Sequence, residues 1–358
     1  MPTLVTNSLK NALNPTILTS KGASTVNRQG GYCFYSDNPE SVTNGPALGS
    51  FDLVDGGGKR WLNKATVNGA GLVYMWHTNG SGAPFKHALL IYNPNSFAIS
   101  VSSSNNGLTQ SNGGSDIAGW TQYFSGNNHL PTPIVIQPNA FGTIFQQTIS
   151  AGYNFGIVAR TNVVNNSTGA AANAIFYDVA YLNTNIGATD WATLKSPSMR
   201  RGVAPTYYNP MNLAEIAPVD TNGIAYRVCG SAANPGVFGT DDIPTVTDYA
   251  PTGNNSTGLL EGGFGQQYAV SMKIKNTFTV SKNFLIMIGK TAASGGSGFP
   301  FVNMAGVSQS YAWVGPGYYC DMIDTGPVAA GATITVNFFM VVPAVSSTPV
   351  IIGARVKP

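Results

Sequence analysis

Apolar and polar residues alternate along much of the chain with the period of two that is typical of half-buried antiparallel strands. The clearest example lies between Phe85 and Gly107, where an apolar run from Ala88 to Tyr92 ends at the turn signal Asn93-Pro94-Asn95. After this turn, apolar residues alternate with small polar ones. We therefore expect two strands joined by a polar bend.

The same pattern returns between Gln266 and Gly296, where two alternating segments again flank a polar bend at Lys275-Asn276-Thr277. The segments downstream also repeat, since each copy closes on a strand that ends in Ala-Arg, at Ala159-Arg160 and at Ala354-Arg355. Corresponding points are roughly 180 to 195 residues apart, whereas solenoid repeats have periods of about 20 to 50 residues. The sequence therefore predicts a duplicated domain.

The predicted fold class is all-β, with two tandem antiparallel β-sandwich domains that resemble jelly rolls and contain little helix. A length of 358 residues fits about two domains. We place an N-terminal arm at residues 1–29, the first sandwich at 30–185, a connector at 186–204 and the second sandwich at 205–358. Within the connector, Thr189 to Lys195 has the pattern of a short capped helix.

The alternation also predicts which side chains form the two cores. In the two repeated strand pairs the apolar positions are expected to face inward. Truncating one of these side chains to Ala should lower the free energy of unfolding by about 2 to 5 kcal/mol. Changes at Ser103 or Asn105 are expected to be nearly silent. The predicted core positions are Ile99, Val101, Val270 and Ile286.

Composition narrows the classes of protein. Charged residues form only 9% of the chain, against about 25% in ordinary globular proteins, but 43% apolar and 11% aromatic residues supply enough burial to fold. The net charge is +3 with scattered basic residues, which argues against direct nucleic-acid binding. No stretch reaches about 18 consecutive apolar residues, so no transmembrane helix is predicted. The first twenty residues lack the apolar core of a signal peptide.

Candidate catalytic chemistry is sparse. His77 and His87 flank a predicted hairpin, and three imidazoles including His129 would suffice for zinc, but nothing in the sequence fixes the third ligand. Two hairpin histidines that bond to loop backbone are the more ordinary interpretation. No phosphate-binding, nucleophile-elbow or zinc-protease motif occurs. We therefore predict no catalytic, metal or cofactor-binding residues, and a protein that is not an enzyme.

A candidate binding loop lies within residues 102–132. Its aromatic and imidazole side chains would sit at the end of a sandwich, and aromatic faces with nearby amides suit sugars. The alternative is that these side chains anchor the loop to the core. The candidate ligand residues are Trp120, Tyr123 and His129.

The N-terminal arm is a candidate assembly element. It has too few apolar residues to form a core, so it must dock on something, and the open edges of a sandwich accept additional strands. We expect the arm to pair with a neighbouring subunit and its deletion to leave both domains folded; pairing within its own chain is the alternative. Its apolar anchors are Leu4, Val5, Leu9, Leu13, Ile17 and Leu18.

Cysteines number three, and the odd count argues against a fully paired disulfide framework. Cys229 and Cys320 lie in the same predicted domain and are the candidate pair, while Cys33 lies in the first domain. The more ordinary interpretation is three buried thiols that pack as small apolar residues.

Short motifs add a family resemblance. The pieces Tyr35 to Glu40, Tyr74 to Gly80, Tyr92-Asn93-Pro94 and Gly263 to Tyr268 resemble those of tandem β-sandwich surface proteins of Gram-positive bacteria. Those proteins often occur together with copper-amine-oxidase-like N-terminal domains. The resemblance implies surface location without known catalysis. It carries over no catalytic residues.

A second resemblance is architectural. Two tandem jelly rolls in about 350 residues, behind a polar arm, are similar to the double jelly-roll subunits of viral capsids. The leading function hypothesis is a non-enzymatic structural subunit of a self-assembling surface structure: a filament, a surface or spore layer, or a virion shell. Its partners would be copies of itself, at the cell or spore surface, outside the cell or in a virion. A carbohydrate-binding adhesion protein with glycan partners is one alternative, and a viral capsid protein is the other.

Overall fold

The computed structural model describes most of the chain. The described residues are 1–5, 10–11, 15–18, 25–26, 28–37, 41–43, 50–52, 59–113, 116–181, 202–229, 243–244, 259–260, 264–290, 301–303, 310–311, 314, 317–343 and 350–358. The chain forms two compact units. The first unit comprises Gly30–Tyr207 and Ile243–Leu260, and the second comprises Met1–Gln29, Tyr208–Asp242 and Glu261–Pro358.

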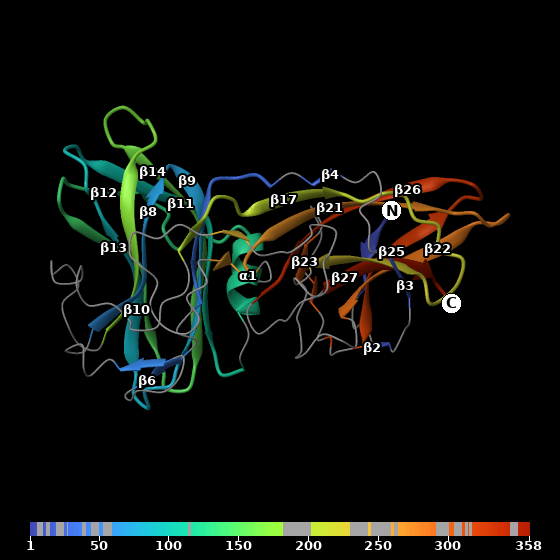
Figure 1. Cartoon of the computed structure of the whole chain (residues 1–358), viewed down its shortest axis with the longest axis horizontal. Helices are drawn as coiled ribbons and strands as arrows, with labels where there is room; N and C mark the ends of the chain where they lie inside the picture. Colours follow the sequence, from blue (N-terminus) through green and yellow to red (C-terminus); the bar gives the residue numbers. More distant parts are fainter. Residues whose placement is uncertain are drawn as a thin grey trace. The chain divides into compact units, whose positions relative to one another are not determined.

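The first unit is a sandwich of two sheets, and the predicted all-β fold class is confirmed (Figure 1). One sheet has the order β13-β10-β15-β8, and the other contains β12-β11-β14-β9. Counted from β8, the first sheet holds strands six, three, eight and one, and the second holds five, four, seven and two, which is the strand order of a jelly roll. The eight strands are β8 (Lys59–Asn68), β9 (Ala70–Asn79), β10 (Phe85–Tyr92), β11 (Ile99–Ser111), β12 (Ile134–Ile136), β13 (Phe141–Ile149), β14 (Asn154–Asn165) and β15 (Asn173–Tyr181).

Short strands extend the β9 side of the second sheet. β5 (Tyr32–Ser36) pairs parallel to β9, and β16 (Val203–Ala204) pairs antiparallel to β5. β6 (Ser41–Thr43) pairs parallel to β9 and to β7 (Ser50–Asp52). The two-stranded sheet of β19 (Ile243–Pro244) and β20 (Leu259–Leu260) also belongs to the first unit.

The second unit repeats this topology. One sheet contains β25-β22-β27-β18-β3, which corresponds strand for strand to β12-β11-β14-β9-β5, and the last pair is parallel in both units. The facing sheet contains β26-β21-β17, with β23 and β24 beyond β26. The new strands are β3 (Thr16–Leu18), β17 (Tyr208–Asn212), β18 (Ile224–Cys229), β21 (Gln267–Lys275), β22 (Lys282–Lys290), β23 (Phe301–Asn303), β24 (Ser310–Tyr311), β25 (Tyr319–Val328), β26 (Thr333–Val341) and β27 (Val350–Val356).

One strand distinguishes the units. In the first unit β15 lies between β10 and β8, so these two strands run in the same direction without touching. In the second unit β17 takes the position of β8 and pairs directly, parallel to β21. The described residues of the second unit contain no counterpart of β15. The duplication predicted from sequence is thus visible in the strand order, apart from β15 and from the short strands at the sheet edges.

The cores lie where the alternation places them. Ile99, Val101 and Ile286 are completely buried and Val270 is almost so. Ser103 lies on the same buried face of β11 as Ile99 and Val101, and the register shifts just beyond it, between Ser103 and Asn106. The Ser103 hydroxyl is buried and donates to the Arg160 carbonyl at 2.7 Å. The expectation that changes at Ser103 would be nearly silent is therefore wrong.

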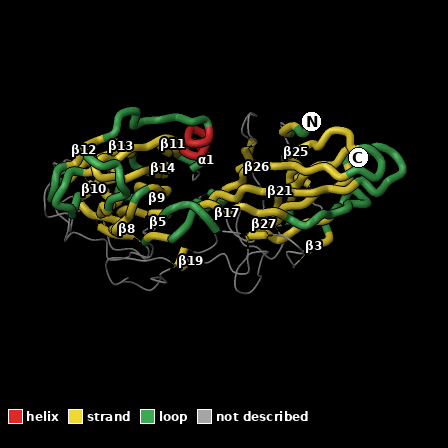
Figure 2. Tube along the Cα trace, turned by 90° about the horizontal axis from the view of Figure 1, so that it is seen from above, coloured by secondary structure: helices red, strands yellow, loops and turns green. Residues whose placement is uncertain are grey.

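Asn105 is also engaged. Its side-chain amide donates to the Tyr123 carbonyl at 3.1 Å, at the end of helix α1 (Ile117–Phe124). α1 is the only helix in the part of the chain that the structure describes, as Figure 2 shows in red. No helix among these residues is long and apolar enough to cross a membrane. The connector helix expected at Thr189 to Lys195 lies outside the described residues.

A buried asparagine fastens the bend of each repeat, and Asn93 shows how. Its Oδ1 accepts the backbone N–H of Asn95 at 2.9 Å, and its amide donates to the carbonyls of Phe97 at 2.8 Å and Ile136 at 2.9 Å. Its backbone exchanges hydrogen bonds with the tight turn at 137–140. One side chain thus satisfies the bend and joins it to the next connection between strands.

The same device occurs twice more, and all three asparagines are completely buried. Asn276 in the second unit and Asn79 in the first each bond the N–H two residues on, the carbonyl four residues on and a distant carbonyl. The distant carbonyl precedes a turn in each case, and the residue three positions after that carbonyl has a left-handed backbone conformation. These left-handed residues are Asn139, Gly331 and Gly152. We call these three devices the asparagine clasps.

The N-terminal arm completes the second unit. β1 (Thr3–Leu4) and β2 (Lys10–Asn11) pair with β25, β3 pairs with β18, and β4 (Thr25–Val26) pairs with β17. Leu4 and Leu18 pack against the main core of the second unit, and Ile17 packs against a smaller cluster. The Val5 N–H donates to the Met322 carbonyl. The described arm therefore pairs within its own chain.

This pairing changes one expectation. Because β3 holds the position that β5 holds in the first unit, deletion of the arm should destabilise the second unit instead of leaving both units folded. Leu9 and Leu13 lie outside the described residues.

The asparagine clasps generate a prediction. Replacing Asn93 with Ala should lower the free energy of unfolding by about 3 kcal/mol, because buried backbone groups of the bend lose their partners. Chemical denaturation measures this loss. Asn166→Ala, at an exposed loop position, is the matched control and should change the midpoint little. Equal midpoints for the two variants would contradict a structural role for the clasp.

Candidate functional site

The predicted ligand loop folds onto the core of the first unit. Trp120 is completely buried in α1, and Tyr123 is nearly so. The Trp120 Nε1 donates to the Asp116 carboxylate at 3.0 Å, and the same oxygen accepts the Tyr74 hydroxyl at 2.6 Å. His129 is exposed, and its Nε2 lies 2.8 Å from Gln122 Oε1.

α1 can approach the sheet closely because two glycines face each other. A Cβ on Gly107 would lie only 1.8 Å from the Gly119 carbonyl oxygen. The helix therefore rests directly on β11, and its aromatic side chains fill the space beside it. Neither Trp120 nor Tyr123 offers an open ring face to a sugar. The structure favours the alternative that these side chains anchor the loop.

The two hairpin histidines do approach one another, but a residue distant in sequence joins them. His77 on β9 and His87 on β10 have their Nε2 atoms 2.8 Å from the two carboxylate oxygens of Asp178 on β15. All three side chains are completely buried. Because β9 belongs to one sheet and the other two strands to the facing sheet, this cluster joins the sheets across the sandwich.

The electrostatics of the cluster follow from its burial. Burial alone would raise the pKa of Asp178, but the two imidazoles outweigh it and hold that pKa well below its usual range. Burial lowers the pKa of His87, against the opposing effect of Asp178. Gln147 Nε2 lies 3.2 Å from His87 Nδ1, which fits a neutral ring that donates from Nε2 to Asp178.

The third imidazole, which the sequence offered as a possible further ligand, lies apart from this cluster. His129 bonds to Gln122 and does not join the pair. Within the described ranges, no group of three or more histidine, cysteine or acidic side chains is arranged to hold a metal ion. The expected bonds to loop backbone are replaced by bonds to a carboxylate. Asp178 was invisible as a partner in the sequence, since it lies about a hundred residues away from either histidine and in an otherwise ordinary strand.

The cysteines play no part in this cluster. Cys33 is a buried free thiol, and burial raises its pKa. Cys320 is also buried. The side chain of Cys229 lies outside the described residues, so pairing of Cys229 with Cys320 stays a prediction.

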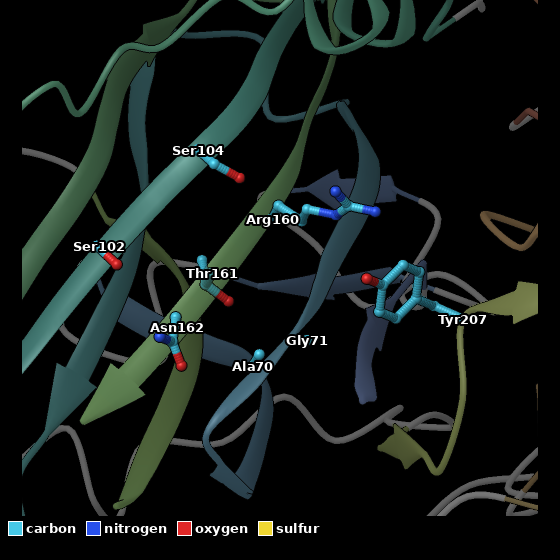
Figure 3. Close-up of a pocket in the computed structure, with 8 residues that line it drawn as sticks. All are labelled: Ala70, Gly71, Ser102, Ser104, Arg160, Thr161, Asn162 and Tyr207. Atoms are coloured by element: carbon cyan, nitrogen blue, oxygen red, sulfur yellow. The ribbon is translucent and has the colours of Figure 1, made fainter. Parts of the chain in front are cut away.

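A pocket of about 420 Å³ lies on the β11-β14-β9 sheet of the first unit (Figure 3). Ser102 pairs with Asn162, which pairs with Ala70, so these residues form one row across three strands. Val101 and Val163, the strand neighbours of Ser102 and Asn162, are core residues, which places the row on the opposite face of the sheet. The pocket is lined by Ala70, Gly71, Ser102, Ser104, Arg160, Thr161, Asn162 and Tyr207.

An arginine and a tyrosine form the most distinctive part of this pocket. The Arg160 guanidinium lies 5.9 Å from the centre of the Tyr207 ring, within the range of a cation–π contact. Tyr207 is itself held against the backbone of Gly30, where a Cβ would lie 2.8 Å from the ring. Gly30 has a φ of +87°, a conformation that favours glycine. The local backbone therefore places Tyr207, and Tyr207 helps to place Arg160.

Sequence reasoning did not identify this site. The Ala-Arg pair that is repeated at the end of both closing strands was a signal that these two arginines have structural roles, because the second copy, Arg355, also makes a defined contact. Arg355 forms a two-pronged ion pair with Asp321 at 2.8 and 2.6 Å. The described residues that line the first-unit pocket include one arginine, which contacts Tyr207. The two equivalent arginines thus have different surroundings.

No family model matches the chain, and no curated protein matches it. The structure is weakly similar to Lac15 from a marine microbial metagenome, with 8% identity, 87% of this chain and 63% of that chain covered, and a TM-score of 0.13. An 11S globulin from Wrightia tinctoria gives 8% identity, 82% and 75% coverage and a TM-score of 0.13. The McoA multicopper oxidase from Aquifex aeolicus gives 12% identity, coverage of 76% of this chain and 54% of that chain, and a TM-score of 0.10. The chain spans less than two thirds of the length of Lac15.

The histidine–aspartate cluster generates a prediction about pH. Below about pH 6.5 an unfolded His87 takes up a proton that the buried ring resists, so the free energy of unfolding should fall by up to about 1.4 kcal/mol per pH unit. The lowered pKa of Asp178 acts in the same direction, but only below about pH 4. Denaturation at pH 7 and pH 5 measures the His87 effect.

The matched variants are His87→Gln and His129→Gln. The first should be less stable at pH 7, because the packed imidazole that donates to Asp178 is lost, and should lose less stability than the parent between pH 7 and pH 5. The second removes an exposed imidazole and should behave as the parent. An unchanged pH response in His87→Gln would show that this ring is not the titrating group.

Proposed function

We propose that the protein is a non-enzymatic structural subunit that assembles with copies of itself into a surface structure. The observation that carries the proposal is the completion of the second unit by the N-terminal arm. β3 fills the position that β5, a strand from the adjacent chain segment, fills in the first unit. The second unit thus depends on strands that precede the whole first unit in sequence.

Such an arrangement is suited to exchange between copies. β1 and β2 are two residues long and β3 is three, so each makes few hydrogen bonds, and their partners lie on β25 and β18. An identical arm from a neighbouring copy would make the same bonds, which is the basis of domain swapping and of strand donation. Because the exchanged element belongs to every copy, the contact can propagate from one subunit to the next.

The surface composition supports the same function. Only 9% of residues are charged and the net charge is +3, so repulsion between copies is weak. Among the candidate assemblies, two jelly rolls in tandem favour a closed shell such as a virion coat, by architectural likeness to double jelly-roll capsid subunits. A filament and a surface or spore layer are the other forms, at the cell surface or outside the cell.

The proposal predicts that assembly requires the arm. Deleting residues 1–18 removes β1, β2 and β3, and should abolish particles or polymers in electron microscopy and light scattering. Because the deletion should also destabilise the second unit, a synthetic peptide of residues 1–29 is added in trans. The peptide should restore the thermal stability of the second unit without restoring polymers, since it cannot link two subunits.

Two variants sharpen this test. Leu18→Asp should impair assembly, because Leu18 packs against the second-unit core, whereas Thr16→Asp, at an exposed position on the same strand, should have a smaller effect. A full-length protein that stays strictly monomeric at high concentration would contradict the proposal. So would a truncated protein that assembles normally.

A second candidate function is carbohydrate binding. The aromatic loop around Trp120 does not favour it, since its rings are buried.

A further inference from the structure

We infer that a groove on the outer face of the β17-β21-β26 sheet binds a segment of a neutral, linear polysaccharide. The groove has a volume of about 290 Å³. This binding activity goes beyond assembly, and it uses a different part of the molecule from the loop around Trp120. The described residues that line the groove all belong to the second unit and are Pro210, Asn212, Ala269, Val270, Ser271, Asn337, Phe338 and Phe339.

The shape of the groove follows from the strand pairing. The small side chains Ala269 and Ser271 lie on the central strand β21, and larger side chains flank them on β17 and β26, which Figure 1 shows beside it. Val270 and Met272, which alternate with them, are core residues, so the groove lies on the opposite face of the sheet. Neighbouring strands are about 4.8 Å apart, so the two walls stand about 10 Å apart. A single chain of sugar rings fits between walls at this spacing.

The groove contains an apolar row beside a polar row. One row consists of Pro210, Ala269 and Phe339, and the next consists of Asn212, Ser271 and Asn337. Adjacent rows on one face of a sheet are about 7 Å apart. A sugar ring carries C–H groups on its faces and hydroxyl groups at its edge, so it can lie against the apolar row with its hydroxyls directed at the polar row. The hydroxyl of Ser271 and the amide of Asn337 both donate and accept hydrogen bonds.

The first unit shows that the jelly roll does not require this face to be open. Asn93 and Asn276 are equivalent, so the positions five residues before them, Ala88 and Ser271, correspond. Ala88 is completely buried in an apolar cluster with Trp61, whereas Ser271 is partly exposed. The same position is therefore covered in one unit and accessible in the other, which favours a role for the opening in binding.

Two other ligand chemistries fit less well. An extended peptide binds a sheet by pairing with an edge strand, but β21 is paired with β17 on one side and with β26 on the other. Recognition in the groove therefore depends on side chains. An apolar ligand would displace water from Ser271 and Asn337 without replacing its hydrogen bonds. A saccharide supplies both an apolar face and hydroxyl partners.

The test uses the full-length protein and isothermal titration calorimetry. The probes are cellohexaose, chitohexaose and mannohexaose, their monosaccharides, and a ten-residue Gly-Ser peptide. At least one hexasaccharide should bind about tenfold or more tightly than its monosaccharide and than the peptide, and added salt should change the affinity little, because the ligand is uncharged. Equal binding of the monosaccharide or of the peptide would overturn the assignment to a polysaccharide. No binding of any hexasaccharide would overturn the proposal.

Variants locate the binding in the groove. Ala269→Leu fills the floor and should abolish binding of the hexasaccharide, and Asn337→Ala, at an exposed position, should weaken it several-fold. Phe141→Ala is the control, because it removes a partly exposed aromatic side chain from the outer face of the corresponding sheet in the first unit, and it should leave binding unchanged. Thermal denaturation verifies that each variant folds. Unchanged affinity in Asn337→Ala and in folded Ala269→Leu would place the ligand elsewhere and refute the inference.

Discussion

Every crossing between the two sheets of a sandwich leaves backbone N–H and carbonyl groups that no strand partner can reach, and burying them unpaired is costly. The asparagine clasps meet this constraint. Asn93 and Asn276 occupy equivalent bends in the two units, and the side-chain amide of each joins its bend to a second loop between strands. Asn79 does the same at a third crossing between the sheets. The jelly-roll order depends on these crossings, because each clasp fixes two connections relative to one another.

The two units differ in how their sheets are linked and extended. The first has β15, whose Asp178 links His77 and His87 across the sandwich, and its own β5 extends the sheet. The described part of the second has neither a β15 counterpart nor an adjacent chain segment in the β5 position, and the arm strand β3 is used there. The eight jelly-roll strands of the first unit therefore follow one another in the chain, whereas the second unit uses a distant segment.

Sequence reasoning recovered what depends on local order. The alternation around Ile99 and Val101 predicted the strands and their buried faces, and Asn93-Pro94-Asn95 predicted the bend. What it missed depends on register between distant strands. The bond of the Ser103 hydroxyl to the Arg160 carbonyl, the meeting of Asp178 with two histidines and the row of Ser102 beside Asn162 all arise from pairings that no local pattern encodes. In the sequence, the aromatic residues of α1 were compatible with anchoring and with ligand binding, and the burial of Trp120 and Tyr123 separates the two.

The pairing of the arm also has a consequence for biosynthesis. The arm leaves the ribosome before the first unit, whereas its partners β18 and β25 follow the eight jelly-roll strands of that unit. Strands β8 to β15 can pair with one another during this interval, before the sheet that accepts the arm has formed. Once that sheet has formed, pairing it with the arm of the same chain closes a long loop, which costs conformational entropy. The arm of an adjacent nascent chain closes no such loop, so the two arms compete for the same sheet. The spacing of chains on one messenger thus becomes a variable that sets whether a subunit closes on itself or on its neighbour.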